Sequence, residues 1–154
     1  MHRLDSCAVD EAEGEEIMQV IKYAFQQHGD QRGMLVAIEE YKDIPFEVKR
    51  VYYMYDTRKE VHRGFHAHKN LEQVLICVNG SCKVKLDNGV ETKIVSLEKP
   101  YEGLYVSNNI WREMYDFAEN TVLMVLASNY YDEEDYIRDY DKFLEFVKKR
   151  KEGK

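Results

Sequence analysis

The sequence lacks an excess of basic residues, a long hydrophobic run and a pair of closely spaced cysteines. Its 22 lysines and arginines are outnumbered by 29 aspartates and glutamates, which leaves a net charge of -7 at pH 7. A chain with this balance does not neutralise phosphates in bulk, so nucleic acid is not an expected partner. No apolar run approaches the roughly 20 residues of a membrane-spanning helix, and the first residues lack the features of a signal peptide. We therefore expect a cytoplasmic protein with no membrane partner.

Cysteine is scarce, and this excludes a scaffold held by disulfides. The three cysteines are Cys7, Cys77 and Cys82, an odd number without a CxxC pair. We interpret them as reduced structural thiols. A chain of 154 residues forms one domain and needs neither disulfide nor metal to fold. We expect residues 1–18 to be a polar extension and residues 19–154 to be the single domain.

Helical periodicity is missing from most of the chain, where short apolar segments alternate with turn signals instead. Asn79-Gly80 and Asn88-Gly89 are strong signals for hairpin turns, because both residue types tolerate positive φ. Short strands without helices between them predict an all-β sandwich or barrel. The expected strands cover residues 21–25, 34–40, 46–55, 66–69, 73–78, 82–86, 93–97, 104–106, 110–115 and 122–127.

The period changes near the C-terminus, where the sequence predicts one α-helix. Asp132 is suited to cap it, and acidic residues at 133–135 would lie in its first turn, on the favourable side of the helix dipole. The side chains expected to face the core recur at helical spacing and are Tyr136, Tyr140, Phe143 and Val147.

Two histidines carry the clearest chemical signal in the sequence. His66 and His68 would point to the same face of a strand, where two imidazoles can hold a metal or move protons. Their spacing to Gly80 resembles the first motif of the cupin superfamily, HxH followed by four residues, Glu, six residues and Gly. Gln73 stands where that motif has Glu, and Arg112 stands where a second motif supplies a third histidine. Because two of four ligands are replaced, we expect no metal and instead proton transfer on a substrate that carries phosphate.

A closer resemblance is to the nucleotide-sugar 3,4-ketoisomerases that act on dTDP-4-keto-6-deoxy-glucose. The stretches that carry it are HGDQRGMLVAIEE (28–40), IPFEVKRVYYMYDT (44–57), RGFHAHKNLEQVLICVNGSCKVKLDNG (63–89) and VLASNYYDEEDYIRDYDKF (125–143). The resemblance implies a small jelly-roll (cupin) barrel without metal or cofactor. It also implies a homodimer with an exchanged N-terminal strand. The implied reaction passes through an enediol and gives a 3-keto sugar for deoxyamino-sugar biosynthesis.

The family's site residues carry over to named positions in this chain. His66 and His68 match its histidine pair, with His68 as the preferred base and His66 returning a proton, although the two roles could be reversed. The substrate-binding residues expected from their positions are Tyr52, Arg63, Arg50, Arg32, Gln73 and Arg112, with Arg32 reaching a ligand in its own or a partner subunit. Arg112 departs from the family pattern, which has histidine after the tryptophan, and it could supply charge for a phosphate or an enolate.

Three other functions compete with ketoisomerisation. A cupin epimerase on the same substrates would abstract a proton with one histidine and a tyrosine opposite, so it would not need the second histidine. A binding module would take dTDP without turnover. A metal-dependent cupin oxygenase would need a divalent ion, which the replaced ligands make less favourable.

Overall fold

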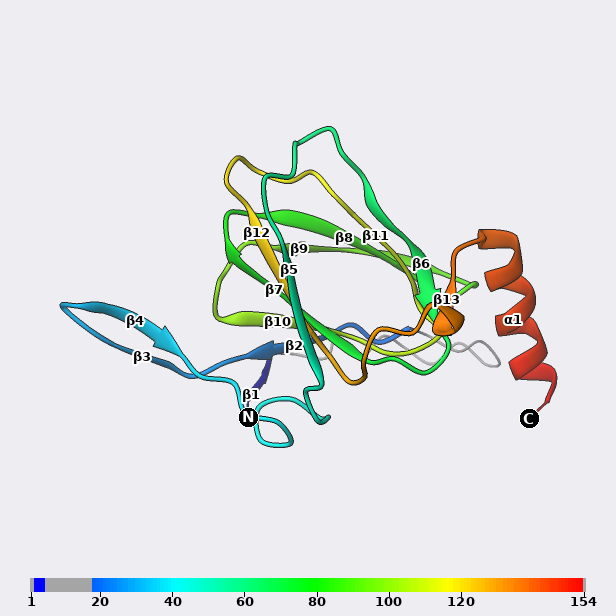
Figure 1. The fold of residues 1–154 in the computed structure, drawn as a ribbon, viewed down its shortest axis with the longest axis horizontal. Coiled ribbons are helices and arrows are strands. Elements are labelled where there is room, and N and C mark those ends of the chain that lie inside the picture. Colours follow the sequence, from blue (N-terminus) through cyan, green and yellow to red (C-terminus); the bar gives the residue numbers. More distant parts are fainter. Residues whose placement is uncertain (1, 5–17, 154) are drawn as a thin grey trace.

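Two antiparallel sheets face each other and enclose the main core, and one helix packs outside them (Figure 1). This computed structural model describes residues 2–4 and 18–153. The expected extension at residues 1–18 lies mostly outside that range. The six-stranded sheet has the order β1 (His2–Leu4), β2 (Ile21–Ala24), β10 (Glu102–Val106), β7 (Gln73–Asn79), β12 (Val122–Ala127) and β5 (Arg50–Met54). The five-stranded sheet has the order β13 (Tyr136–Ile137), β6 (Arg63–His68), β11 (Trp111–Tyr115), β8 (Cys82–Asp87) and β9 (Thr92–Leu97).

The period-2 pattern decides which side chains enter the barrel. Leu75 and Val125 point into the core between the sheets, whereas their neighbours Val74 and Leu126 point outward. The outward residues are covered by the loop after β4, which contributes Ile44 to a second apolar cluster. Each of the ten predicted segments overlaps a strand, and the predicted all-β fold with a C-terminal helix is confirmed.

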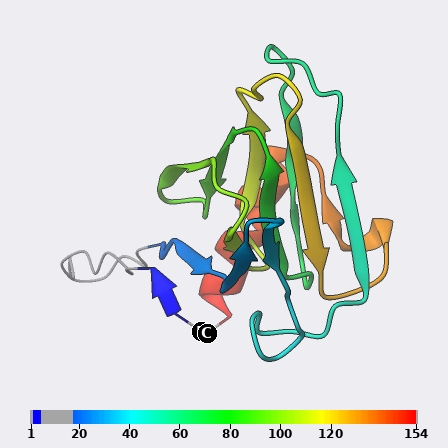
Figure 2. The same ribbon diagram turned by 90° about the vertical axis from the view of Figure 1, so that its left-hand side faces the viewer.

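A separate hairpin projects from the body of the protein. It consists of β3 (Gln27–Asp30) and β4 (Gly33–Val36), and it extends away from both sheets in Figure 1. In Figure 2 the molecule is turned so that this side faces the viewer. The predicted strand at 34–40 is therefore shorter than expected, and it leaves the barrel. Exposed apolar side chains on this hairpin include Met34 and Leu35.

The two Asn-Gly turns have different outcomes. Asn88-Gly89 joins β8 to β9, which pair over their whole length, as predicted. Asn79-Gly80 also forms a turn, with Gly80 at φ 79°. However, β7 and β8 belong to different sheets, so this turn carries the chain from one sheet to the other and the predicted hairpin is wrong there. A Cβ at Gly80 would lie 2.3 Å from Thr121 Oγ1, which explains the glycine.

The C-terminal helix begins later than predicted. Asp132 caps only a short 3-10 turn, Glu133–Asp135, and the chain then pairs as β13 with β6. The α-helix α1 spans Tyr140–Glu152 and is capped by Asp139. Residues 136–137 form a strand and not the first turns of a helix, because Tyr136 and Ile137 pair with the edge of β6. From α1, Phe143 packs on Ala67 and Trp111, on the outer face of the five-stranded sheet.

Candidate active site

The outward packing of Ala67 and Trp111 turns their neighbours into the barrel. His66, His68 and Arg112 therefore share the inner face of the five-stranded sheet, where Arg112 is paired directly opposite His66. The other sheet supplies Tyr52 from β5 and Gln73 from β7. The tertiary fold thus brings together two histidines that the sequence placed on one strand and polar residues from three other strands.

The two histidines present the same ring nitrogen to the cavity. Nδ1 of His66 lies 3.0 Å from the carbonyl oxygen of Gly64, and Nδ1 of His68 lies 3.0 Å from Oδ2 of Asp135. Both oxygens accept hydrogen bonds, so this geometry assigns the proton to Nδ1 in each ring. Each Nε2 atom is buried and has no partner among the described residues. With ring centres 4.9 Å apart, the pair offers two adjacent proton acceptors.

Burial holds both histidines in the neutral form. It lowers the pKa of His66 to about 4 and that of His68 to about 2, and the nearby Arg112 cation lowers both further. A neutral imidazole at neutral pH is able to take a proton from carbon, whereas an imidazolium is not. The pair is therefore in the protonation state that a base requires.

Arg112 is a buried cation without a carboxylate partner among the described residues. Its side chain is 1% exposed. Nη1 donates to Gln73 Oε1 at 2.5 Å and Nη2 donates to the carbonyl oxygen of Ile110 at 2.9 Å, while Nε has no partner. Gln73 in turn donates from Nε2 to the hydroxyl oxygen of Tyr52 at 2.9 Å, which leaves the Tyr52 hydroxyl proton free to point elsewhere. Burial lowers the pKa of Arg112 to about 10, so it remains charged at pH 7.

A second cation, Arg50, lies on the β5 side of the site. The Arg50 guanidinium lies over the rings of Tyr52 and Tyr131, 5.2 and 5.6 Å from their centres. Its Nε and Nη2 atoms are buried and have no partner within the described part of the chain. Arg50 is therefore in the site, as predicted from the strand face that it shares with Tyr52.

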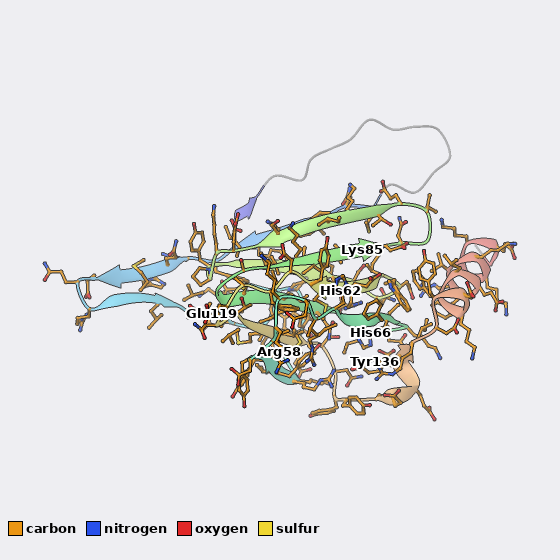
Figure 3. All side chains as sticks on the ribbon, turned by 90° about the horizontal axis from the view of Figure 1, so that it is seen from above. Arg58, His62, His66, Lys85, Glu119 and Tyr136 are labelled. Atoms are coloured by element: carbon orange, nitrogen blue, oxygen red, sulfur yellow. The ribbon has the colours of Figure 1, made fainter. Side chains whose placement is uncertain are left out.

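The segment 128–139 contributes residues that the sequence did not reveal as part of the site. Tyr136 places its ring 5.0 Å from that of His66 and 4.4 Å from that of His68 (Figure 3). Arg138 stacks on the Tyr136 ring at 4.2 Å and pairs with Glu133. Tyr136 was expected in a helix facing the core. The interrupted helix is the reason that this residue and Asp135 were missed.

Two predicted arginines are not brought to the histidines. Arg32 lies at the tip of the β3–β4 hairpin, exposed and paired with Asp30. It does not reach the site of its own chain. Arg63 begins β6, but its side chain is exposed, and no contact described for the two histidines involves it.

Unpartnered polar atoms gather at this site. Among the described residues, six buried side-chain nitrogen and oxygen atoms have no hydrogen-bond partner. Five of them belong to the site and are Arg50 Nε, Arg50 Nη2, His66 Nε2, His68 Nε2 and Arg112 Nε. Buried polar groups are normally satisfied, so this concentration indicates a polar ligand that accepts from the arginines. Nowhere in residues 2–4 and 18–153 do three or more His, Cys, Asp or Glu side chains gather to hold a metal.

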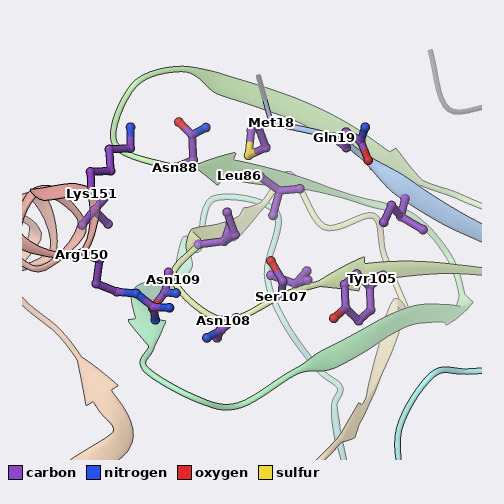
Figure 4. A pocket seen from close by; sticks show the side chains of 14 residues that line it. Met18, Gln19, Leu86, Asn88, Tyr105, Ser107, Asn108, Asn109, Arg150 and Lys151 are labelled. Carbon is purple, nitrogen blue, oxygen red and sulfur yellow. The ribbon is translucent and has the colours of Figure 1, made fainter. Parts of the chain in front are cut away.

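A separate cavity of about 430 Å³ lies between β2, the β10–β11 loop and the end of α1 (Figure 4). None of the predicted site residues lines it. Its wall includes Asn109, whose backbone N–H donates to the carbonyl oxygen of His68 at 2.7 Å. The cavity thus adjoins the backbone of the histidine strand but contains none of the reacting groups.

Comparison with known proteins shows to which family this chain belongs. Residues 18–148 match the family described as FdtA: WxcM-like, C-terminal. The chain belongs to this family. Over 132 residues it is 57% identical to a TDP-4-oxo-6-deoxy-α-D-glucose-3,4-oxoisomerase of Aneurinibacillus thermoaerophilus, covering 84% of this chain and 95% of the relative. The expected family is therefore confirmed.

Solved structures of 3,4-ketoisomerases agree with the fold. A 3,4-ketoisomerase from Helicobacter canadensis has a TM-score of 0.84 and 48% identity, covering 86% of this chain and 99% of the other. A histidine-to-asparagine mutant of the 3,4-ketoisomerase QdtA from Thermoanaerobacterium thermosaccharolyticum, in complex with TDP-4-keto-6-deoxyglucose, has a TM-score of 0.83 and 50% identity, covering 85% and 95%. The predicted jelly-roll fold and the predicted enzyme class, an isomerase, are confirmed. No helix in the described residues is long and apolar enough to span a membrane.

The buried neutral histidines predict an acid-sensitive fold. The pKa of His66 is lowered to about 4, against about 6.5 in an unfolded chain. Below pH 6.5 the unfolded chain therefore binds a proton that the folded protein does not, and stability present above pH 6.5 is lost as the pH falls toward 4. Between pH 7 and 5 the loss is about 2 kcal/mol for this one residue. Urea unfolding at pH 7 and pH 5 measures this loss. The difference in the free energy of unfolding between the two pH values should be about 2 kcal/mol smaller in His66→Gln than in the parent protein.

The matched control for this experiment is His62→Gln, because His62 is exposed in the segment before β6. This variant should keep the pH dependence of the parent protein. An unchanged dependence in His66→Gln would contradict the assignment of a buried, neutral His66.

Proposed function

We propose that this protein is a metal-independent 3,4-ketoisomerase of dTDP-4-keto-6-deoxy-glucose that produces a dTDP-3-keto-6-deoxy-hexose. The observation that carries the proposal is the cluster of five unpartnered atoms on two histidines and two arginines. The names of the relatives, a 3,4-oxoisomerase and 3,4-ketoisomerases of TDP-linked sugars, support the substrate. An epimerase would leave the second histidine without a role.

The proposed reaction moves two protons. His68 Nε2 takes the proton from C3, the C3–H electrons form a C3=C4 double bond, and the negative charge moves to O4. The protonated His68 gives this proton to O4, which forms the neutral enediol. His66 Nε2 then takes the hydroxyl proton of O3 and delivers it to C4 as the C3 carbonyl forms. The product therefore has the carbonyl at C3 and a hydroxyl at C4, with no net gain or loss of protons or electrons.

The cations and hydroxyl of the site have separate tasks in this scheme. Arg112 stabilises the negative charge of the enediolate, because a fixed cation in a buried site needs no reorganisation as the charge develops. The free proton of Tyr52, set by the donor direction of Gln73, hydrogen-bonds a sugar oxygen. Arg50 donates from its two unpartnered atoms to the sugar or the pyrophosphate.

The donor set also supports a reaction without metal. Gln73 and Arg112, which replace two cupin ligands, are engaged with each other by a hydrogen bond. The buried Arg112 guanidinium beside the two histidines would repel a divalent cation. His66 and His68 alone would hold such an ion weakly.

Proton exchange in deuterated water tests the proposal. Protein treated with EDTA is incubated with dTDP-4-keto-6-deoxy-glucose and followed by NMR. A 3-keto sugar with deuterium at C4 is the expected product. Deuterium at C3 or C5 with the 4-ketone retained would favour the epimerase. Binding of dTDP without any exchange would favour the binding module, and activity restored only by a divalent ion would favour a metal-dependent cupin.

The proposal includes a homodimer with an exchanged N-terminal strand, and we assign the projecting β3–β4 hairpin to the same interface. A two-stranded hairpin standing alone is marginally stable, yet this one exposes Met34 and Leu35, which are 66% and 58% accessible. A second copy of the chain would cover them and bring Arg32 to the partner's site. Light scattering should give twice the chain mass. Mixing inactive Arg32→Ala and His68→Asn subunits should restore activity if Arg32 acts across the interface, and a lack of recovery would remove Arg32 from the site.

A further inference from the structure

Asp135 is the one carboxylate that contacts either histidine of the site directly among the described residues. Its Oδ2 lies 3.0 Å from Nδ1 of His68. The same carboxylate accepts from the backbone N–H groups of Asn70 and Leu71, at 2.8 and 3.3 Å. The backbone carbonyl of Asp135 also accepts from Lys69 at 3.0 Å. Four hydrogen bonds thus fix Asp135 against the end of β6 and the residues that follow it.

These contacts make the carboxylate an acceptor on every side. Two of the three groups that donate to the side chain are backbone N–H groups, which are always donors. Each of the two carboxylate oxygens therefore accepts from one backbone N–H group. An ionised carboxylate can only accept from His68, so Nδ1 carries the proton and Nε2 carries the free lone pair that faces the cavity.

The two histidines differ in this respect. Nδ1 of His66 contacts the neutral carbonyl of Gly64, on its own strand. Nδ1 of His68 contacts a charged group that reaches it from 67 residues further along the chain. After proton transfer, the imidazolium of His68 would be stabilised by a carboxylate in contact with it, whereas that of His66 would have only the electrostatic effect of Glu133, which makes no hydrogen bond to it among the described residues. The pair is chemically asymmetric although both residues lie on one strand face.

We propose that Asp135 is the positioning residue of the reaction, which holds His68 in the Nδ1–H tautomer and so selects it as the base of the pair. This inference rests on the proposed ketoisomerase function. It adds a residue outside the HxH motif and gives a physical reason for the unequal roles of two similar histidines. Asp135 acts through His68 and does not itself touch the substrate.

The substitution that tests this role is Asp135→Asn. Asparagine keeps the size and one acceptor oxygen, but its amide can donate to Nδ1 and so favour the Nε2–H tautomer, which blocks the lone pair. We expect kcat to fall about 10²- to 10⁴-fold, the range for a base in the wrong tautomer, with KM changed less than about threefold. A fall in kcat of less than threefold would overturn the proposal.

A spectroscopic readout separates positioning from loss of structure. Nitrogen-15 NMR of the His68 ring at pH 7 should give the Nδ1–H tautomer in the parent protein and a shift toward Nε2–H in Asp135→Asn. An Nε2–H tautomer in the parent protein would overturn the proposal even if Asp135→Asn failed to fold. Glu134→Gln is the matched control, because it removes a neighbouring exposed carboxylate from the same turn, and it should leave both readouts unchanged.

Comparing His68→Asn with Asp135→Asn separates a failure of this inference from a failure of the proposed function. If His68→Asn retained full turnover, the base assignment would fail, and with it the catalytic consequence for Asp135. If the parent enzyme isomerised the sugar but Asp135→Asn kept both tautomer and kcat, only the positioning role would fail.

Discussion

Replacing His68 with asparagine should remove turnover while leaving the affinity for dTDP nearly intact. The imidazole Nε2 is the proposed acceptor of the C3 proton, and an amide has no comparable basic nitrogen. A general base contributes about 10²- to 10⁴-fold to rate, so we expect kcat to fall by at least 10²-fold. The Kd for dTDP, measured by calorimetry, should change less than threefold, because the base is not a group that binds the nucleotide.

Two companion variants make the result for His68 interpretable. His62→Asn is the matched control, because His62 is exposed and stacks on Tyr115 at 5.0 Å, which is not a residue of the site. It should retain full activity. His66→Asn should still exchange the C3 proton slowly into deuterated water while product formation fails. The opposite pattern, with exchange lost in His66→Asn and kept in His68→Asn, would reverse the two roles.

The barrel could be predicted from sequence because its signal is local. Alternation along each strand fixes the face that each side chain occupies, and the same rule placed Tyr52 with Arg50 and His66 with His68. Gln73 and Arg112 were predicted as site residues from their positions in the two motifs, and a hydrogen bond joins them in the structure. These residues could be found without knowing which strands are neighbours in the sheet.

The missing parts of the site depend on long-range pairing. Residues 133–139 have a helix-like sequence, but β13 pairs with β6 because the edge of that strand is available. This pairing turns Tyr136 toward the histidines and brings Asp135 to His68, and no local pattern contains that information. Arg63 lies outside the cluster for a related reason, since adjacency in sequence to a motif does not place a side chain in the cavity. Arg32 lies outside the site of its own chain and stays a prediction for the site of a partner subunit.

Burial of the Arg112 charge destabilises the folded state, and the hydrogen bonds of its guanidinium offset part of this effect. The charge is buried without an anionic partner among the described residues, and such burial costs several kcal/mol. Removing it would leave Gln73 and Ile110 each without a donor, at about 1–3 kcal/mol apiece. Because these effects oppose each other, Arg112→Met should change the free energy of unfolding by less than about 2 kcal/mol.

Activity should respond to Arg112→Met far more strongly than stability does. Loss of one preorganised donor to a developing oxyanion lowers kcat about 10²- to 10³-fold, and we expect that range here. Removing the cation should also raise the pKa of His66 and of His68, because Arg112 lowers both. Steady-state kinetics and urea unfolding on the same preparations measure the two effects. Arg58→Met, an exposed arginine outside the site, should change neither. A variant that lost stability in proportion to its activity would show that Arg112 holds the barrel together and that its charge does not act on the enediolate.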